Sequence, residues 1–360
     1  METLLKRGWA PRRTVGIVFG HDEEIGGFDG ARHAYEWLAD AVRKPSPRSV
    51  EGTAALPSHP FAFLLDEGLF VLSGAVPGLP KSLQTALICT EEKGFVTVRL
   101  GVTGVTGGHA SSPPAVTAAG VLSRAVAKLE ANLFPARFGA SVAVESMFRA
   151  LLPHFPFTHR LVFANASWLT RPLVTALLAA TPASAALVRT TTAPTVMRVG
   201  TKSNTLSPDG YALVNHRILP GESVASVLAR DACVIGDERI TLSAVDPVEP
   251  SPVSDPSGPA FRIIAKAAET VFSNSVAVPA LMVGATDSRW AWSHVRQILR
   301  HSPTELRVDE VRMFHGRDER ISLPNLARTC AFYELVISGA DAAALDGDGD
   351  VHSAVPGASN

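Results

Sequence analysis

Acidic side chains directly follow two short apolar runs of the sequence, and a threonine and an aspartate follow a third. His21–Glu24 (HDEE) follows TVGIVF, Asp66-Glu67 follows FAFLL, and Gly284–Asp287 (GATD) follows ALMV. In an open parallel sheet, ligands bind beyond the carboxyl ends of the strands, so we expect these side chains at one edge. Clustered carboxylates stay ionised only beside cations, and carboxylate and imidazole groups suit zinc. The sequence therefore predicts a metal site, with zinc as the first choice.

The adjacent residues Glu23 and Glu24 can have different roles. On a loop or a strand end, neighbouring side chains point in different directions, so one can ligate a metal while the other faces a substrate. A carboxylate beside a metal-bound water is what general-base catalysis requires. The alternative interpretation is an acidic turn that opens a helix, because Glu is favoured near the positive end of the helix dipole.

Two histidines lie in segments that can present a side chain. His315 lies in FHGR, between a short apolar stretch and the last predicted helix, and His109 lies in GGHASSPP. The glycines before His109 allow close backbone approach, and the prolines after it restrict the loop. For each histidine alone, a structural or surface role is the alternative interpretation.

The composition excludes several classes of protein. The chain has 360 residues, which suggests about two domains, and 46% of them are apolar. This apolar content excludes a mainly disordered chain, and a formal net charge of −1 argues against nucleic-acid binding as the main task. Three cysteines without CxxC spacing indicate neither a disulfide framework nor a thiolate zinc site. No apolar run approaches the ~20 residues of a membrane-spanning helix.

The first part of the chain has the pattern of an α/β unit. Thr14–Phe19 (TVGIVF) is short, rich in β-branched residues and bounded by Gly20, which predicts a buried strand. Apolar residues then recur at helical spacing from Gly30 to Val42, and Phe61–Leu65 predicts a second buried strand that ends at Asp66. Strand, helix and strand in this order indicate a parallel sheet.

The pattern changes near Gly94. Phe95–Val105 predicts an exposed strand, Ala115–Leu133 a helix, and Tyr211–Ile218 and Arg239–Val245 two further strands. These elements predict a smaller α+β domain inserted into the first.

The last part of the chain returns to the first domain. Pro247–Pro259 has the composition of a linker. It is followed by a predicted helix at Ala260–Phe272, a short strand at Ala280–Val283 and a closing helix at Leu323–Ile337. The remaining residues are small, acidic and rich in glycine, which predicts a disordered tail.

Six motifs, in this order, carry a family resemblance: RTVGIVFGHDEEIGG, LLDEG, GHASSPP, GTKSNTLSPDGYALVNHRILPGE, VGATDSR and MFHGRDERISL. They resemble the carboxypeptidase S branch of the dinuclear zinc peptidases and amidohydrolases, a family that includes aminoacylase and glutamate carboxypeptidase. The resemblance covers about residues 1–337. It implies hydrolysis of a peptide or N-acyl amino acid bond adjacent to a free carboxylate.

The resemblance also implies residue roles on the metal side of the site. Glu23 would be the general base, Glu24 and His315 would ligate one zinc ion, and Asp66 would ligate the other.

On the substrate side, the resemblance implies that His109 crosses a dimer interface to polarise the scissile carbonyl. Asn204 and Arg217 would hold the substrate's carbonyl and free carboxylate, and the forked guanidinium of Arg217 suits a carboxylate. Gly284 would line the pocket with its backbone, and Asp287 would either brace its loop or touch the substrate.

The implied fold is an α/β zinc-peptidase catalytic domain, at residues 1–93 and 248–338, around an inserted α+β lid at 94–247. The lid would form a homodimer, and residues 339–360 would be the disordered tail. Partners other than a second copy and the small substrate are not indicated.

The sequence departs from the family pattern in one respect. The family's H-x-D motif and the bridging Asp of its G-R-G-x-x-D-D-K motif are absent from this sequence. We therefore expect the catalytic domain to be incomplete at its N-terminus, with an incomplete set of zinc ligands. His21, His33 and His59 are the alternatives considered as substitute ligands, and a catalytically impaired fragment or non-catalytic paralogue is the alternative function.

Overall fold

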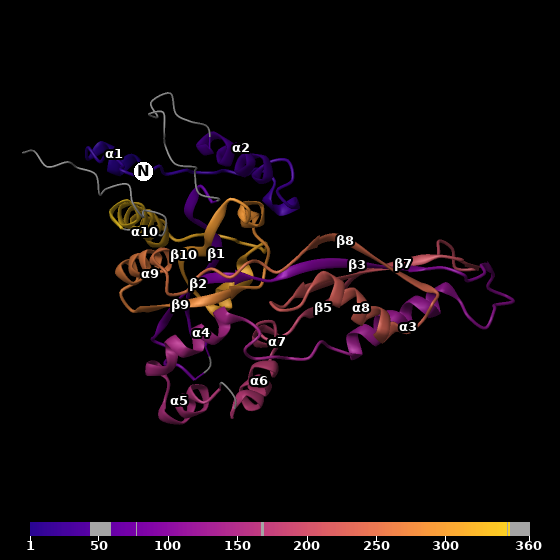
Figure 1. Ribbon diagram of the computed structural model, residues 1–360. Helices are drawn as coiled ribbons and strands as arrows, with labels where there is room; N and C mark the ends of the chain where they lie inside the picture. Colours follow the sequence, from indigo (N-terminus) through magenta and orange to yellow (C-terminus); the bar gives the residue numbers. More distant parts are fainter. Residues whose placement is uncertain (44–58, 77, 167–168, 344, 346–360) are drawn as a thin grey trace, which may run out of the picture.

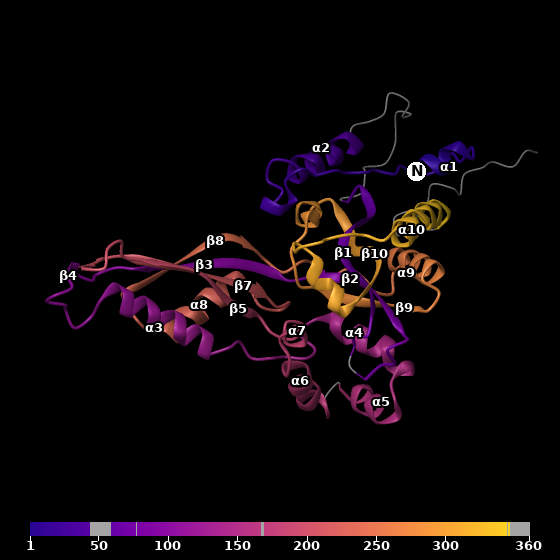
Figure 2. The same ribbon diagram turned by 180° about the vertical axis from the view of Figure 1, so that it is seen from behind.

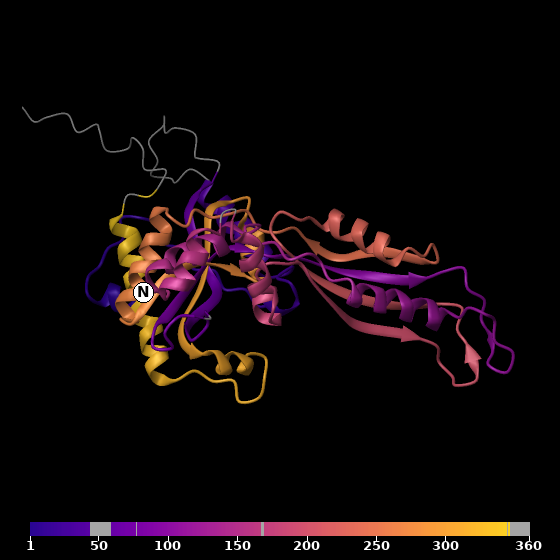
Figure 3. The same ribbon diagram turned by 90° about the horizontal axis from the view of Figure 1, so that it is seen from below.

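The computed structural model describes residues 1–43, 59–76, 78–166, 169–343 and 345. These residues form two units, each built on a four-stranded sheet. Figure 1 shows the first sheet with helices packed around it and the second sheet extending away from it as a long arm. The elongated outline is clearest in Figure 3.

The first sheet is mixed. Its strand order is β1 (Phe61–Ser73), β10 (Val295–Arg307), β2 (Gln84–Glu92) and β9 (Ser275–Met282). β1 is parallel to β10 and β2 is parallel to β9, but β2 runs antiparallel to both β10 and the end of β1. The expectation of a parallel sheet is therefore wrong for the sheet as a whole, because β1 turns back directly into β2.

Helices cover both faces of the first sheet. On one side lie α9 (Pro259–Val271) and α10 (Leu323–Ala342). On the other side lie α4 (Val142–Leu151), α5 (Phe157–Ala164) and α6 (Arg171–Ala179). The alternation along β2 produces these two cores. Ala86 and Ile88 pack with α9 and α10, while Leu87 and Cys89 face α4 and α6.

The second sheet is antiparallel, with one covered face. Its strand order is β5 (Thr191–Val199), β7 (Gly210–Ile218), β3 (Gly94–Val102) and β8 (Ile240–Val248). The helices α3 (Ala118–Ala131) and α8 (Val224–Ile235) pack on it, and the side chains of Thr117 and Ser223 cap their N-termini. At the end of the arm, β4 (Gly108–His109) pairs with β6 (Thr205–Leu206), as Figure 2 shows from behind.

The remaining elements are short helices and one amphipathic helix. They are α1 (Glu2–Lys6), α2 (Ala31–Arg43) and α7 (Pro182–Ala185), with the 3-10 turns η1 (Glu23–Ile25), η2 (Leu152–His154), η3 (Asp287–Ala291) and η4 (Val308–Met313). Among the described residues, no helix combines the length and apolar character needed to cross a bilayer.

The predicted buried strand at Thr14–Phe19 is wrong. The segment forms no strand, and three of its apolar side chains are exposed: Val15 by 37%, Ile17 by 57% and Phe19 by 88%. Only Val18 is half-buried, against the cluster that contains Tyr35. A strand requires a neighbouring strand for its backbone hydrogen bonds, and no described strand lies beside this segment. It runs instead from an anchor on α10, where the backbone amides of Arg12 and Arg13 donate to Asp341.

Other differences concern the extent and number of the strands. β1 continues past Asp66 to Ser73, and the strands β2 and β10 have no counterpart in the prediction. The closing helix extends to Ala342, so the first residues of the predicted tail are helical. Residues 344 and 346–360 of that tail, and the segment 44–58, lie outside the described residues.

The domain bounds at 93/94 and 247/248 stay a prediction. β3 begins at Gly94 and β8 ends at Val248, close to these positions. Helices α4 to α6, between 142 and 179, pack against the first sheet although they lie within the sequence range of the predicted lid.

His301 on β10 should make stability depend on pH. Its side chain is fully buried, with Nδ1 2.9 Å from the carbonyl oxygen of Leu87, and burial lowers its pKa to about 4. Between pH 4 and the unfolded value of 6.5, the unfolded state binds more protons than the folded state. The free energy of unfolding should therefore fall as pH falls through this window, by roughly 3 kcal/mol from this group.

The measurement is urea unfolding as a function of pH for the native chain and His301→Asn. Asparagine retains a donor near Leu87 but does not titrate, so the variant should lose stability less steeply below pH 6.5. Equal slopes for the two proteins would contradict this assignment.

Candidate active site

Glu23 and Glu24 lie in the turn η1, and Asp22 holds this turn in place. Asp22 is only 7% exposed, and its Oδ2 accepts hydrogen bonds from the backbone amides of Asp29 at 2.7 Å and Gly30 at 3.0 Å. The side chain of Asp22 thus closes the loop before α2. Both glutamates therefore project from a turn that hydrogen bonds between backbone amides and the side chain of Asp22 hold in place.

Arg289 and Trp290 of η3 hold the other end of the same turn. The carbonyl oxygen of Gly26 accepts a hydrogen bond from Nε1 of Trp290 at 3.1 Å and another from the guanidinium of Arg289. Gly27 has a φ of +68°, and Asp287 packs so closely that a Cβ at Gly27 would clash with its carboxylate. In this structure Asp287 braces the turn.

A pocket of about 960 Å³ opens between the two units. Its walls come from η1, from β1, from the ends of β7 and β8, and from the loops after β9 and β10. The polar and charged residues that line it are Glu23, Glu24, Glu67, Asn215, Arg217, Asp246, Thr286, Arg289, Ser302, His315 and Glu319.

The pocket brings together five of the eight predicted site residues: Glu23, Glu24, Arg217, Gly284 and His315. Asp66 lies beside the pocket without lining it, and the next residue, Glu67, lines it instead. Asp66 accepts a hydrogen bond from the backbone amide of Glu67 at 2.9 Å.

His109 and Asn204 lie elsewhere, at the far end of the arm. They are neighbours there, since the backbone amide of Ala110 donates to the carbonyl oxygen of Asn204 at 2.9 Å. The amide of Ser111 donates to Nδ1 of His109 at 3.2 Å, so the neutral ring carries its proton on Nε2. The exposed Nε2–H is then available as a donor.

Arg217 reaches the pocket because of the alternation along β7. Ala212, Val214 and His216 face the buried core beneath α3 and α8, so Asn215 and Arg217 lie on the open face of the sheet. The guanidinium of Arg217 lies over the ring of Phe95, its partner in the β3–β7 register, at 5.4 Å. Partial burial lowers the pKa of Arg217. The guanidinium nevertheless stays charged, because arginine is not deprotonated in proteins.

The carboxylates near η1 raise one another's pKa values. Burial, followed by the charges of Asp287, Glu24 and Asp66, raises the pKa of Glu23. Burial, followed by the charges of Glu23, Asp66, Asp287 and Glu24, raises the pKa of Glu67 to about 7. Burial, followed by the charge of Asp66, raises the pKa of Asp287 to about 6. Burial also raises the pKa of Asp66. Such a cluster favours proton uptake or cation binding.

The predicted zinc ligands do not form a complete site. Nδ1 of His315 lies 3.7 Å from Oε1 of Glu24, and both side chains are largely exposed. Within the part of the chain that the structure describes, no three His, Cys, Asp or Glu side chains are grouped closely enough to hold a metal ion. Structural and catalytic zinc sites use at least three protein ligands, so these residues alone do not fit zinc.

A buried ion pair lies directly behind the pocket. Nε of Arg300 is 2.5 Å from Oε2 of Glu92, and the two side chains are 1% and 3% exposed. Glu92 also accepts hydrogen bonds from the backbone amide and hydroxyl of Thr286, at 3.0 and 2.9 Å, and Arg300 donates to Ser288 at 2.8 Å. Burial raises the pKa of Glu92, and the adjacent guanidinium opposes this by favouring the ionised form.

The sequence interpretation missed this pair and Asn215. A signal for Glu92 existed, because the charged residues Glu91-Glu92-Lys93 follow the apolar run ALIC after one threonine, Thr90. Arg300 follows Ile298 and Leu299 and precedes His301, and its partner Glu92 lies far away in the sequence.

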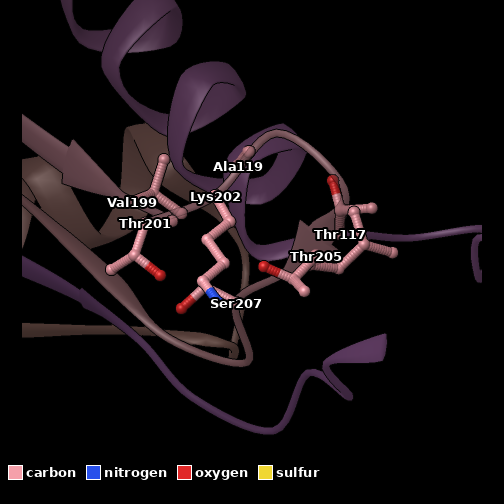
Figure 4. A pocket seen from close by; sticks show the side chains of 9 residues that line it. Thr117, Ala119, Val199, Thr201, Lys202, Thr205 and Ser207 are labelled. Atoms are coloured by element: carbon pink, nitrogen blue, oxygen red, sulfur yellow. The ribbon is translucent and has the colours of Figure 1, made fainter. Parts of the chain in front are cut away.

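A second pocket, of about 350 Å³, lies on the arm near the N-terminus of α3. Figure 4 shows the amine of Lys202 and the hydroxyls of Thr117, Thr201, Thr205 and Ser207 around it. Its lining contains no carboxylate or imidazole, so it offers no general base.

Residues 1–339 match peptidase family M20/M25/M40, and the chain belongs to this family. It is 38% identical over 342 residues to the N-fatty-acyl-amino acid synthase/hydrolase PM20D1 of Xenopus tropicalis, a match that covers 95% of this chain and 63% of that protein. It is 33% identical over 343 residues to the probable carboxypeptidase S-like 2 of Dictyostelium discoideum, covering 95% of this chain and 62% of that protein.

Among solved structures, the M20 family metallo-carboxypeptidase Sso-CP2 from Sulfolobus solfataricus shares the fold. The TM-score is 0.55 at 13% sequence identity, and the match covers 89% of this chain and 69% of that chain. The predicted carboxypeptidase S branch and the α/β fold with a lid are confirmed. The chain spans under two thirds of the length of these two curated relatives.

Loss of the charge on Glu92 should destabilise the fold strongly. Glu92→Gln leaves Arg300 without a counter-charge in the interior, so urea unfolding should show a loss of roughly 3 kcal/mol or more. The matched control is Glu2→Gln, which removes an ion pair of similar length, 2.6 Å to Lys6, at the surface. This control should change stability by less than about 0.5 kcal/mol. Similar small losses in both variants would contradict a structural role for the buried pair.

Proposed function

We propose that the protein to which this chain belongs hydrolyses the amide bond of a peptide or an N-acyl amino acid next to a free carboxylate. The single observation that carries the proposal is the pocket that Glu23 and Arg217 both line. It presents a candidate general base and a carboxylate-binding guanidinium to one bound molecule. The names of two relatives, an N-fatty-acyl-amino acid synthase/hydrolase and a probable carboxypeptidase S-like protein, suggest the substrate class.

Each residue has a separate part in the proposed reaction. Arg217 binds the free carboxylate of the substrate through its forked guanidinium. Glu23, whose pKa is raised by burial and neighbouring carboxylates, takes a proton from the attacking water and passes it to the leaving amine. Gly284 lines the pocket without a side chain, so the substrate can approach the backbone closely.

His109 and Asn204 act from a second copy of the chain in this proposal. Strand β4, which carries His109, lies at the end of the arm (Figure 2). Neither His109 nor Asn204 lines the pocket of its own chain. A homodimer formed through the arm would bring them to the partner's pocket. There, Nε2–H of His109 would donate to the oxyanion, and Asn204 would hold the substrate's carbonyl group.

Zinc remains the proposed cofactor, with Glu24, Asp66 and His315 as the ligands that this chain contributes. These three residues do not complete a site within the described residues, so the steps above are assigned to protein side chains alone.

A non-catalytic role is the second candidate function. The observation that favours it is the incomplete set of metal ligands: no group of three such residues occurs in the described part of the chain. In that case the pocket would bind a carboxylate-containing ligand without cleaving it, and the arm would serve as a dimerisation module.

The decisive assay for the proposed function is hydrolysis of N-acyl amino acids and dipeptides with zinc supplied. Glu23→Gln should lower kcat by at least about a hundredfold while substrate binding and zinc content stay close to those of the parent protein. The matched control is Glu36→Gln on α2, an exposed carboxylate outside the pocket, which should retain full activity. Full turnover by Glu23→Gln would show that Glu23 is not the general base. No turnover by the unsubstituted protein would favour the non-catalytic role.

Complementation between variants tests the shared site. His109→Ala and Glu23→Ala should each be inactive, but a mixture should regain activity, because a mixed dimer contains one intact combination of His109 and Glu23. Steady-state turnover of mixed and unmixed samples, with the oligomeric state measured by light scattering, makes the comparison. A dimer without any regain of activity would contradict a site completed by the partner.

A further inference from the structure

Strand β8 is irregular where it borders the pocket. Two neighbouring pairs of the β3–β8 ladder are Thr97 with Val245 and Phe95 with Val248. Between these pairs β8 contains one residue more than β3, which makes Asp246 part of a β-bulge. The φ of Asp246 is +48°, a value that residues other than glycine rarely adopt. Bulges of this kind often redirect a side chain beside an active site.

The bulge changes the side of the sheet on which Asp246 lies. Ile240 and Leu242, which precede it by six and four positions on β8, pack in the core beneath α3 and α8. Because side chains alternate along a regular strand, Asp246 would point into the same core. The extra residue shifts the register by one, and Asp246 lines the pocket on the open face instead. A local departure from the regular strand thus gives the pocket a carboxylate.

The carboxylate of Asp246 has no counter-charge within the protein. In the part of the chain that the structure describes, no Lys, Arg or His side chain forms an ion pair with it. Arg217 and Arg289 line the same pocket, but both guanidiniums lie over the ring of Phe95, at 5.4 and 5.6 Å. Five carboxylates and two guanidiniums line the pocket in total. A ligand that adds a cation therefore complements this pocket better than one that adds a second anion.

Arg217 and Asp246 lie on opposite sides of β3. β3 separates β7 from β8 in the sheet, so the backbones of these two strands are roughly 10 Å apart. The guanidinium of Arg217 extends over Phe95 of β3, and therefore from β7 towards β8. A molecule whose carboxylate binds this guanidinium can reach Asp246 with a flexible side chain of four or five atoms. Lysine and arginine have side chains of this length that end in a cation.

We propose that Asp246 determines substrate specificity by binding the cationic side chain of the amino acid whose free carboxylate Arg217 holds. Substrates in which this amino acid is lysine or arginine are then preferred. A carboxylate and an ammonium or guanidinium form strong, charge-assisted hydrogen bonds. Asn215 adds a second acceptor, because its Nδ2 donates to Oγ1 of Thr97 at 3.1 Å and its Oδ1 stays available to the pocket. This inference rests on the proposed function and adds the chemistry of the residue that carries the carboxylate.

Two ligands of similar size that differ in charge test the proposal. They are Nα-octanoyl-lysine and N-octanoyl-norleucine, whose side chain ends in a methyl group in place of the ammonium. Isothermal titration calorimetry with the full chain at neutral pH should show about tenfold tighter binding of the lysine ligand. Where the protein turns over both ligands, kcat/KM should show the same preference.

Asp246→Asn should bring the two affinities to within about twofold of each other. Asparagine tolerates a positive φ as aspartate does, so the bulge is retained while the charge is lost. The matched control is Glu238→Gln, which removes an exposed carboxylate just before β8 and outside the pocket. This control should keep the tenfold preference for the lysine ligand. Circular dichroism checks that each variant is folded.

The outcomes separate this inference from the proposed function. Equal binding of the two ligands by the unsubstituted chain, or a preference that persists in Asp246→Asn, would overturn the role of Asp246 alone. The pocket would in that case still bind a free carboxylate. Arg217→Gln should weaken the binding of both ligands. If it weakened neither, or if the unsubstituted chain bound neither, the proposed function and this inference would fall together.

Discussion

The buried ion pair between Glu92 and Arg300 joins the parts of the molecule that form the pocket. Glu92 ends β2 just before the chain enters the arm through β3, and Arg300 lies within β10. Both bind the loop that carries Thr286 and Ser288. Because an unpaired charge in the interior is very unfavourable, these segments are restricted to the arrangement in which the two charges meet. The pocket wall formed by Gly284 and Thr286 depends on that arrangement.

Both units contribute charged side chains to one pocket. The first unit supplies the carboxylates of Glu23, Glu24 and Glu67 and the guanidinium of Arg289. The arm supplies Arg217 and Asp246. The carboxylates raise one another's pKa values, which favours a proton or a cation near them. In the proposed function, the free carboxylate of the substrate binds Arg217 and its amide bond lies near Glu23.

The sequence predicted much of the site from local patterns. Apolar runs followed by carboxylates pointed to Glu23, Glu24 and Asp66. Glu23 and Glu24 line the pocket, and the roles of all three stay a prediction. The same reasoning missed Arg300 because no residue near it in the sequence points to its partner Glu92. It also placed Thr14–Phe19 in a sheet, because its composition is that of a strand. Composition describes what a segment prefers, and a strand forms only where another strand accepts its hydrogen bonds.

The sequence by itself determined the family, the order of the motifs and the types of residue that line the pocket, because these depend on local residue types and their spacing. Only the tertiary structure decided that Arg217 and Glu23 line one pocket. It also decided that His109 and Asn204 lie together at the end of the arm. The packing of α5 and α6 on the first sheet was decided at the same level. These outcomes depend on contacts between residues far apart in the chain, and such contacts leave no local pattern in the sequence.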